Sequence, residues 1–74
     1  MSEKTFDKIE FMEMLIQLFS EHYGMSDVQA CRYMGRHQGL SLAEKHYGAL
    51  HTLPFQDMVE FETNVCKNHG GMLQ

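Results

Sequence analysis

Residues 6 to 23 carry apolar side chains at intervals of three and four, and this period constrains the possible folds most strongly. The expected core line comprises Phe6, Ile9, Met12, Leu15 or Ile16, Phe19 and Tyr23. Gly24 follows where a helix commonly ends, because glycine adopts the left-handed backbone conformation without steric cost. The segment is therefore predicted to form an amphipathic α-helix that ends near residue 23.

Three more apolar residues widen this stripe beyond the width that one packed face of a small domain requires: Phe11, Met14 and Leu18. A chain of this size buries only about 60% of the surface that its unfolded form exposes. We therefore expect these three side chains to lie off the core line. So broad an apolar surface must be covered by the rest of the chain, by a second copy or by another protein, and these three are the candidate contact residues for a partner.

A second and a third helix are indicated by two capping-box patterns. The first pattern, from Ser26 to Gln29, opens a helix whose expected inner face is formed by Val28, Cys31 and Met34. The second pattern, from Ser41 to Glu44, opens a short helix that runs to about residue 50.

A fourth helix is predicted after Pro54, because proline suits the first turn of a helix. Thr52 or Leu53 would cap it, and its expected inner line is Phe55, Met58, Phe61 and Val65. No segment shows the sustained alternation of a β-strand. The sequence therefore predicts one all-α domain over residues 1–74, a small compact bundle of about four helices with the third short.

The polar start and the lack of a long apolar run predict a cytoplasmic protein that does not span a membrane, with reduced cysteines. The chain carries a net charge of −4, no run reaches the length of a membrane span, and its start is polar. This acidic balance disfavours a free-standing duplex-DNA binder. The alternative of a nucleic-acid-binding patch depends on the basic residues of the middle segment, Arg32, Arg36 and Lys45.

The sequence offers little for catalysis or for a bound cofactor. Five histidines and two cysteines leave a metal or redox sensor as a further alternative, but the paired close ligands of a structural zinc site are missing. Cys31 and Cys66 fall on apolar stripes or their edges, where a thiol acts as a small hydrophobic group. We therefore expect no enzymatic activity, no cofactor and no metal site.

The stretch from Tyr47 to Thr52 is predicted to build a corner between two helices. Tyr47 and Leu50 are three apart, so both can turn inward, and Thr52 can cap the following helix. The His51 ring can bond a carbonyl at a helix end. Each residue type therefore has a structural use at this corner.

The same stretch resembles a small all-helical bacterial family of unknown function with a Y-x-x-L-H-T signature before an amphipathic last helix. The matching residues are Tyr47, Leu50, His51 and Thr52, then Asp57-Met58-Val59-Glu60 and Gly70. Members of that family are often encoded beside a larger protein that resembles an ADP-ribosyltransferase toxin. The resemblance therefore implies a small accessory or antitoxin-like partner, and it assigns no catalytic residue.

Together, these patterns predict a non-catalytic protein-interaction module that buries its apolar helix face against a partner. They also predict a homo-oligomer, most simply a dimer, because the first helix is too apolar for so short a chain to cover.

Overall fold

A computed structural model describes residues 3–71 of the chain, with side chains from residue 7 onward. Over this range the chain forms five helices and no strand, which confirms the all-α prediction. The helices are α1 (Glu3–Tyr23), α2 (Asp27–Arg36), α3 (Gly39–Lys45), α4 (Tyr47–Leu50) and α5 (Phe55–Asn68).

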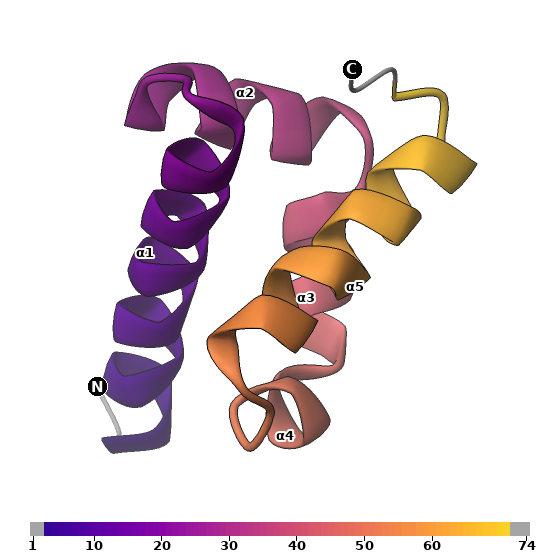
Figure 1. Ribbon diagram of the computed structural model, residues 1–74. Helices are drawn as coiled ribbons and strands as arrows, with labels where there is room; N and C mark the ends of the chain where they lie inside the picture. Colours follow the sequence, from indigo (N-terminus) through magenta and orange to yellow (C-terminus); the bar gives the residue numbers. More distant parts are fainter. Residues whose placement is uncertain (1–2, 72–74) are drawn as a thin grey trace.

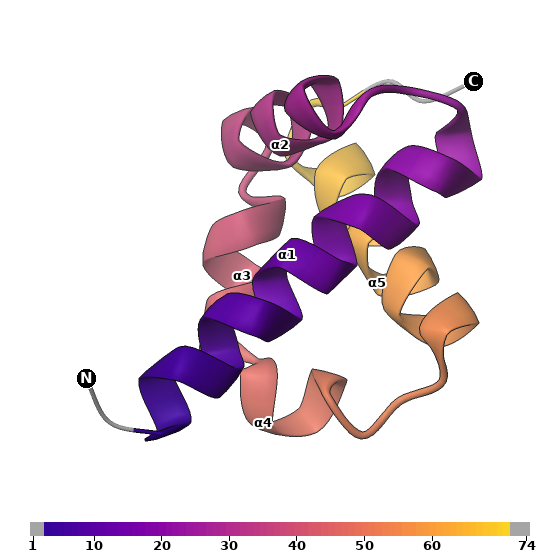
Figure 2. The ribbon, with the colours of Figure 1, turned by 90° about the vertical axis from the view of Figure 1, so that its left-hand side faces the viewer.

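The two longest helices, α1 and α5, contact each other, and each also contacts the short helix α3 (Figure 1). Helix α2 lies across one end of the bundle and α4 lies at the other end. Seen from the side, α1 runs diagonally across the front of α3 and α5 (Figure 2). Because α1 contacts α2, α3 and α5, it is the element around which the core forms.

The face that α1 buries differs from the expected core line. Phe11, Leu15 and Phe19 are spaced by four and are buried, whereas Ile9 is 43% exposed. Placing Phe11 off the core was therefore wrong. The apolar stripe of α1 is so wide that its spacing is compatible with more than one buried face. The contacts with α2, α3 and α5 determine which of these faces is buried. Phe6, also placed on the core line, lies outside the described side chains.

The end of α1 and the start of α2 follow the sequence signals closely. Gly24 has a φ of 63°, and the Met25 N–H donates to the Ser20 carbonyl at 2.9 Å, as in a Schellman motif. The capping box at Ser26 is also formed. The Gln29 N–H donates to Ser26 Oγ at 3.1 Å, and the Ser26 N–H donates to Gln29 Oε1 at 3.0 Å.

The inner face predicted for α2 is only partly correct. Met34 is buried, but Val28 is 60% exposed and Cys31 is exposed, while Ala30 takes their place in the core. Two features fix this rotation of the helix. The small Ala30 side chain allows close packing, and Ser20 Oγ of α1 donates to Asp27 Oδ1 at 2.7 Å.

The predicted third helix is divided into two in the structure. Helix α3 begins at Gly39, after Gln38 with a φ of 63°, so Ser41 lies inside the helix and the predicted capping box there is wrong. His46 separates α3 from α4. This break turns the chain so that Leu50 enters the core.

Helix α5 begins at Phe55, with Pro54 as its N-cap in place of the expected Thr52 or Leu53. Its first predicted core residue, Phe55, is 59% exposed. The buried line instead joins Met58, Glu62 and Cys66 at intervals of four. A glutamate therefore occupies a central position of the core.

Candidate functional site

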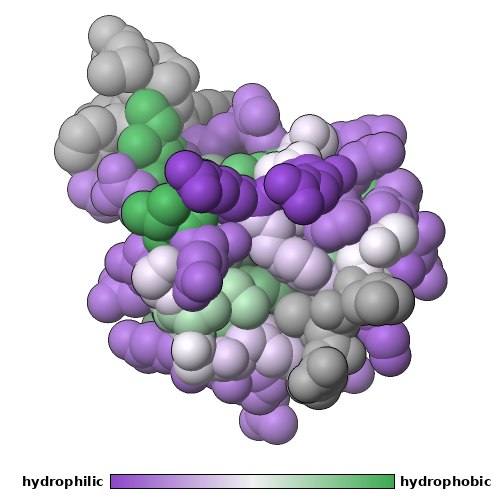
Figure 3. Space-filling model, turned by 90° about the horizontal axis from the view of Figure 1, so that it is seen from above, coloured by the Kyte–Doolittle hydropathy of each residue, from purple (hydrophilic) through white to green (hydrophobic). Residues whose placement is uncertain are grey.

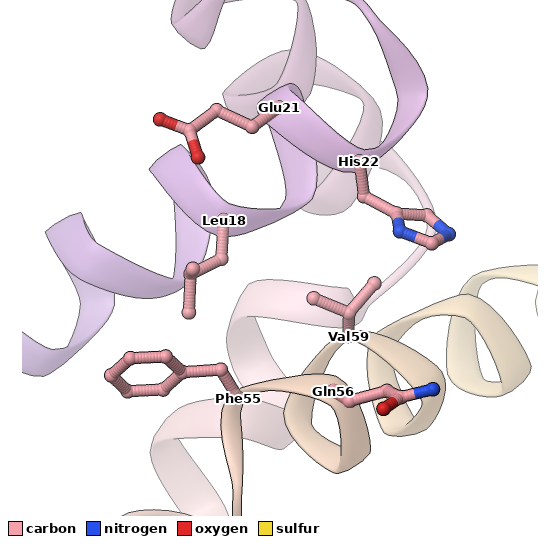
Figure 4. A pocket seen from close by; sticks show the side chains of 6 residues that line it. All are labelled: Leu18, Glu21, His22, Phe55, Gln56 and Val59. Carbon is pink, nitrogen blue, oxygen red and sulfur yellow. The ribbon is translucent and has the colours of Figure 1, made fainter.

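A groove of about 410 Å³ lies between α1 and α5, and we call it the α1–α5 groove. Its lining residues are Leu18, Glu21 and His22 of α1 with Phe55, Gln56 and Val59 of α5. Leu18 and Phe55 point toward each other across the groove, and Val59 lies between the two helices (Figure 4). The groove therefore has apolar side chains at its centre.

The α1–α5 groove continues along the helices into a second hollow, which shares His22, Gln56 and Val59 with it. The hydroxyl groups of Tyr23 and Thr63, which line this hollow, are hydrogen-bonded at 2.5 Å. The combined groove follows the two helices and has Glu21 and Glu60 among its lining residues. It is thus elongated, with acidic side chains beside an apolar centre.

The three predicted contact residues occupy different environments. Phe11 is a core residue that packs edge-on against Tyr47, with ring centroids 5.1 Å apart, so it is not part of an open surface. Met14 is half-buried against the core, and Leu18 is half-buried and lines the α1–α5 groove. Sequence reasoning missed Phe55. It was placed on the inner line of the last helix, because an apolar residue at that interval has the pattern of a core position.

A second groove, of about 430 Å³, lies between α1 and α2 and is called the α1–α2 groove below. It is lined by Glu13, Ile16, Gln17, Asp27, Val28 and Cys31. Val28 and Cys31 were both predicted to be internal, so sequence reasoning missed this groove as well.

A buried polar cluster lies where α2, α3 and α5 meet. Glu62 is fully buried, and neither carboxyl oxygen has a hydrogen-bond partner among residues 7–71. Burial raises the pKa of Glu62 to about 8. Burial, and then the nearby Glu62 charge, raise the pKa of the Cys66 thiol to about 11. Both groups are therefore held largely in their neutral forms near neutral pH.

Gly39, at the start of α3, makes room for this cluster. A Cβ atom at this position would clash with Glu62 Oε2 and lie 3.1 Å from Cys66 Sγ and 3.2 Å from the Met34 carbonyl oxygen. Tyr33 Oη is also buried without a hydrogen-bond partner within the described residues. The cluster is packed tightly and is closed to solvent at Glu62 and Cys66.

The basic residues proposed for nucleic-acid binding do not form one patch. Arg32 and Arg36 are exposed and four apart on α2, so they share a side of that helix. Lys45 ends α3, at the opposite end of the bundle next to α4 (Figure 1). Two of the three residues thus lie together and the third is remote.

Neither a metal site nor a membrane span is found within residues 3–71. Within that range no three His, Cys, Asp or Glu side chains are grouped to hold a metal ion. No helix in the described part of the chain is long and apolar enough to cross a bilayer. Both cysteines are free thiols, with Cys31 exposed and Cys66 buried.

The corner from Tyr47 to Thr52 has the structure expected of it, with one exception. His51 Nδ1 lies 2.8 Å from the Tyr47 carbonyl oxygen, and the two rings stack at 4.8 Å. Leu50 is buried. Thr52 Oγ1 donates back to the Ala49 carbonyl at 2.8 Å, so it completes the end of α4 and does not cap α5.

Replacing His51 with alanine is expected to lower stability modestly, because the variant loses one hydrogen bond and one ring contact at the corner. The expected loss is about 0.5–1.5 kcal/mol, since His51 is exposed. Thermal unfolding followed by circular dichroism measures it. An unchanged melting temperature would show that the corner does not depend on His51.

Residues 10–69 match a family described as "Protein of unknown function (DUF3791)". The chain belongs to this family. The DUF3791 match begins in the first half of α1 and extends just past α5, so it includes both grooves, the Glu62 cluster and the Tyr47–Thr52 corner.

The expected membership of a small family of unknown function is thereby confirmed. The Y-x-x-L-H-T signature and the neighbouring toxin-like gene stay predictions. No curated protein and no solved structure matches the chain.

Proposed function

We propose that this DUF3791 protein is a non-catalytic interaction module that binds a helix of a larger protein in the α1–α5 groove. Its partner is expected to be the ADP-ribosyltransferase-like neighbour, for which it would act as an accessory or antitoxin-like subunit. The observation that carries the proposal is the exposed Phe55 ring, which faces Leu18 across an elongated groove.

The apolar centre of the groove supports a protein ligand. A phenylalanine that is 59% exposed has much apolar surface to bury, and aromatic anchors in grooves contribute strongly to binding. Because the groove follows two adjacent helices, its shape suits an elongated ligand. An amphipathic helix with apolar residues at positions i, i+3, i+4 and i+7 has this shape.

Charge indicates what flanks the apolar face of that partner helix. Glu21 and Glu60 lie in the groove, and exposed Asp57 follows Gln56 on α5. A partner helix with lysine or arginine beside its apolar face complements these acids. We therefore propose a basic amphipathic helix as the occupant.

The buried cluster favours a structural role for the two ionisable groups with the most perturbed pKa values. Glu62 and Cys66 are both 0% exposed, so a substrate has no access to them in this conformation. Their burial supports a binding module over an enzyme.

The experiment is co-purification from the source cells with the tagged wild-type chain and two matched variants. Phe55→Ser removes the groove aromatic, and Val28→Ser removes an equally exposed apolar side chain from the α1–α2 groove. We expect one protein to co-purify at near-equal amount with wild type and Val28→Ser. Recovery with Phe55→Ser should fall about tenfold or more, as for loss of an anchor residue.

A charge variant tests the chemistry of the partner. Glu60→Lys is expected to weaken recovery and to make the remaining binding less sensitive to salt. Equal recovery with Phe55→Ser and wild type would contradict the proposed groove. A captured protein whose protected segment is not a basic amphipathic helix would contradict the proposed occupant.

A further inference from the structure

The first turn of α3 covers the two most deeply buried polar groups of the Glu62 cluster. A Cβ atom at Gly39 would clash with Glu62 Oε2 and lie 3.1 Å from Cys66 Sγ, so the Gly39 backbone rests directly against both groups. In the view onto α2, most of the surface over this end of the bundle is hydrophilic (Figure 3). Glu62 and Cys66 are both fully buried, so water reaches them only when packed helices separate.

Helix α3 is held in the bundle by little apolar surface. Its fully buried residues are Gly39 and Ala43, which have the smallest side chains, whereas Leu40 and Leu42 are half-buried. The hydrophobic stabilisation of a packed segment scales with the apolar area that it buries. A segment with few buried apolar contacts opens at a lower free energy than the rest of its domain.

The chain breaks at both ends of α3. Gln38 has a φ of 63°, a left-handed conformation that is strained for a residue other than glycine. His46, with a φ of −103°, ends α3 on the other side. Beyond these breaks, Met34 of α2 and Leu50 of α4 are buried in the core. Helix α3 can therefore turn about its two ends while the neighbouring helices stay packed.

Ionisation of Glu62 favours this separation. Neither carboxyl oxygen has a hydrogen-bond partner among the described side chains, and burial raises the pKa of Glu62 to about 8. A carboxylate buried without a partner is strongly destabilised relative to one in water. Because Gly39 of α3 lies directly against Glu62 Oε2, moving α3 away is a direct route for water to this oxygen.

The groups packed around Glu62 provide no cation to stabilise its charge in the closed form. Cys66 on α5 and Tyr33 on α2 both have pKa values raised by burial, so they stay neutral below pH 8. The two charged residues of α3, Glu44 and Lys45, are exposed. Helix α1 contributes apolar side chains to the core, namely Phe11, Leu15 and Phe19.

We propose that α3 is a lid over the Cys66 thiol, and that loss of the Glu62 proton opens this lid while α1, α2 and α5 stay folded. In the closed form neither group is accessible. In the open form water solvates the Glu62 carboxylate and the Cys66 thiol can react with an electrophile. The proposal uses no residue that lines the α1–α5 groove, so it does not depend on the proposed partner.

The population of the open form should rise about tenfold for each pH unit between about pH 5 and pH 8. In this range the closed form keeps the Glu62 proton, whereas the open form, in which the pKa has its ordinary value of 4.5, releases it. Above pH 8 the closed form ionises as well, so the rise levels off. Below pH 4.5 both forms are protonated and the population does not change with pH.

Alkylation of Cys66 by iodoacetamide tests the proposal in the folded Cys31→Ser protein, in which Cys66 is the sole thiol. Where the rate is proportional to the reagent concentration, it reports the population of the open form. The matched control is Glu62→Gln in the same background, because glutamine cannot ionise. Comparison at equal pH removes the effect of thiol ionisation, so the ratio of the two rates should rise about tenfold for each pH unit up to pH 8.

Low concentrations of urea distinguish opening of α3 from global unfolding. Opening of a short helix exposes little surface, so Cys66 alkylation should be nearly independent of urea below the unfolding transition. Amide hydrogen exchange locates the opening. The amides of Leu42 and Ala43 should exchange with the same independence of urea, whereas those of Leu15 and Phe19 in α1 should exchange only through urea-dependent global unfolding.

Circular dichroism first establishes that both proteins are folded at each pH. A ratio of alkylation rates that does not change with pH would overturn the proposal. Alkylation that depends on urea as strongly as global unfolding, or no alkylation of the folded protein at pH 8, would also overturn it. Exchange of the α3 amides only through global unfolding would show that α3 is not the lid.

Discussion

Replacing Glu62 with glutamine is expected to remove the largest single pH dependence of the stability of this protein. The Glu62 carboxyl is fully buried without a hydrogen-bond partner among the described residues, and its pKa in the folded protein is raised to about 8. In the unfolded chain the pKa returns to its ordinary value of about 4.5. Glutamine has nearly the same shape but cannot ionise.

The sign of this pH dependence follows from the number of protons that the folded and unfolded states bind. Between pH 4.5 and pH 8 the folded protein holds the Glu62 proton and the unfolded chain releases it, so stability falls as the pH rises through this window. Below pH 4.5 both states are protonated and the penalty disappears. At about 1.4 kcal/mol for each pH unit, wild type should lose about 3–5 kcal/mol between pH 4.5 and pH 8.

Chemical denaturation of wild type and Glu62→Gln at matched pH values measures this effect. The difference in unfolding free energy between the two proteins isolates Glu62, because the contributions of the five histidines cancel. We expect the unfolding free energy of the glutamine variant, relative to that of wild type, to increase steadily as the pH rises from 5 to 8. Parallel stability curves for the two proteins would show that Glu62 is not held neutral in the core.

The second large effect is expected for Gly39→Ala. The new Cβ would clash with Glu62 Oε2 and press against Cys66 Sγ and the Met34 carbonyl, all within a closed cluster. Overpacking of this kind costs about 1–3 kcal/mol, because the backbone carbonyl cannot move aside without shifting α2. Denaturant unfolding at pH 6 measures this loss.

Gly35→Ala is the matched control for this substitution. A Cβ at Gly35 would meet only Leu40 Cδ1, at an ordinary contact distance of 3.7 Å, and Gly35 lies in the last turn of α2. Alanine in a helix interior is about 0.5–1 kcal/mol more favourable than glycine. The control should therefore be neutral or stabilising, and an equal loss in both variants would contradict the packing described around Gly39.

The parts of the fold that sequence reasoning predicted correctly depend on local chemistry. Gly24 ends α1 and the Ser26 capping box opens α2, because backbone conformation and capping hydrogen bonds are decided by residues within one turn. The all-α class follows from the apolar period alone. His51 likewise bonds a carbonyl at the preceding helix end, four residues away.

The incorrect predictions concern which face of a helix is buried. Phe11 lies in the core and Phe55 is exposed, the reverse of their expected places, although both are apolar residues on amphipathic helices. Contacts between helices determine which of two neighbouring faces of an amphipathic helix is buried. A bond such as Ser20–Asp27, which orients α2 on α1, joins residues seven apart and is not visible in a periodic pattern.

Glu62 illustrates why the core could not be predicted from hydrophobicity. A glutamate between Phe61 and Thr63 has the pattern of a solvated position, yet the intervals of four from Met58 to Cys66 place it inside. Phe55 and Val28 were missed as groove residues for the same reason, since both were assigned to the core, whereas Leu18 of the α1–α5 groove was predicted as a contact residue.

The most direct test of the interaction-module proposal is a map of chemical shifts in the isotope-labelled chain upon addition of the helix from its co-purified partner. We expect the largest changes at Leu18, Phe55 and Val59, with little change at Val28 and Cys31. Saturable changes centred on another surface, or none at concentrations where the full partner binds, would contradict the assignment of the α1–α5 groove.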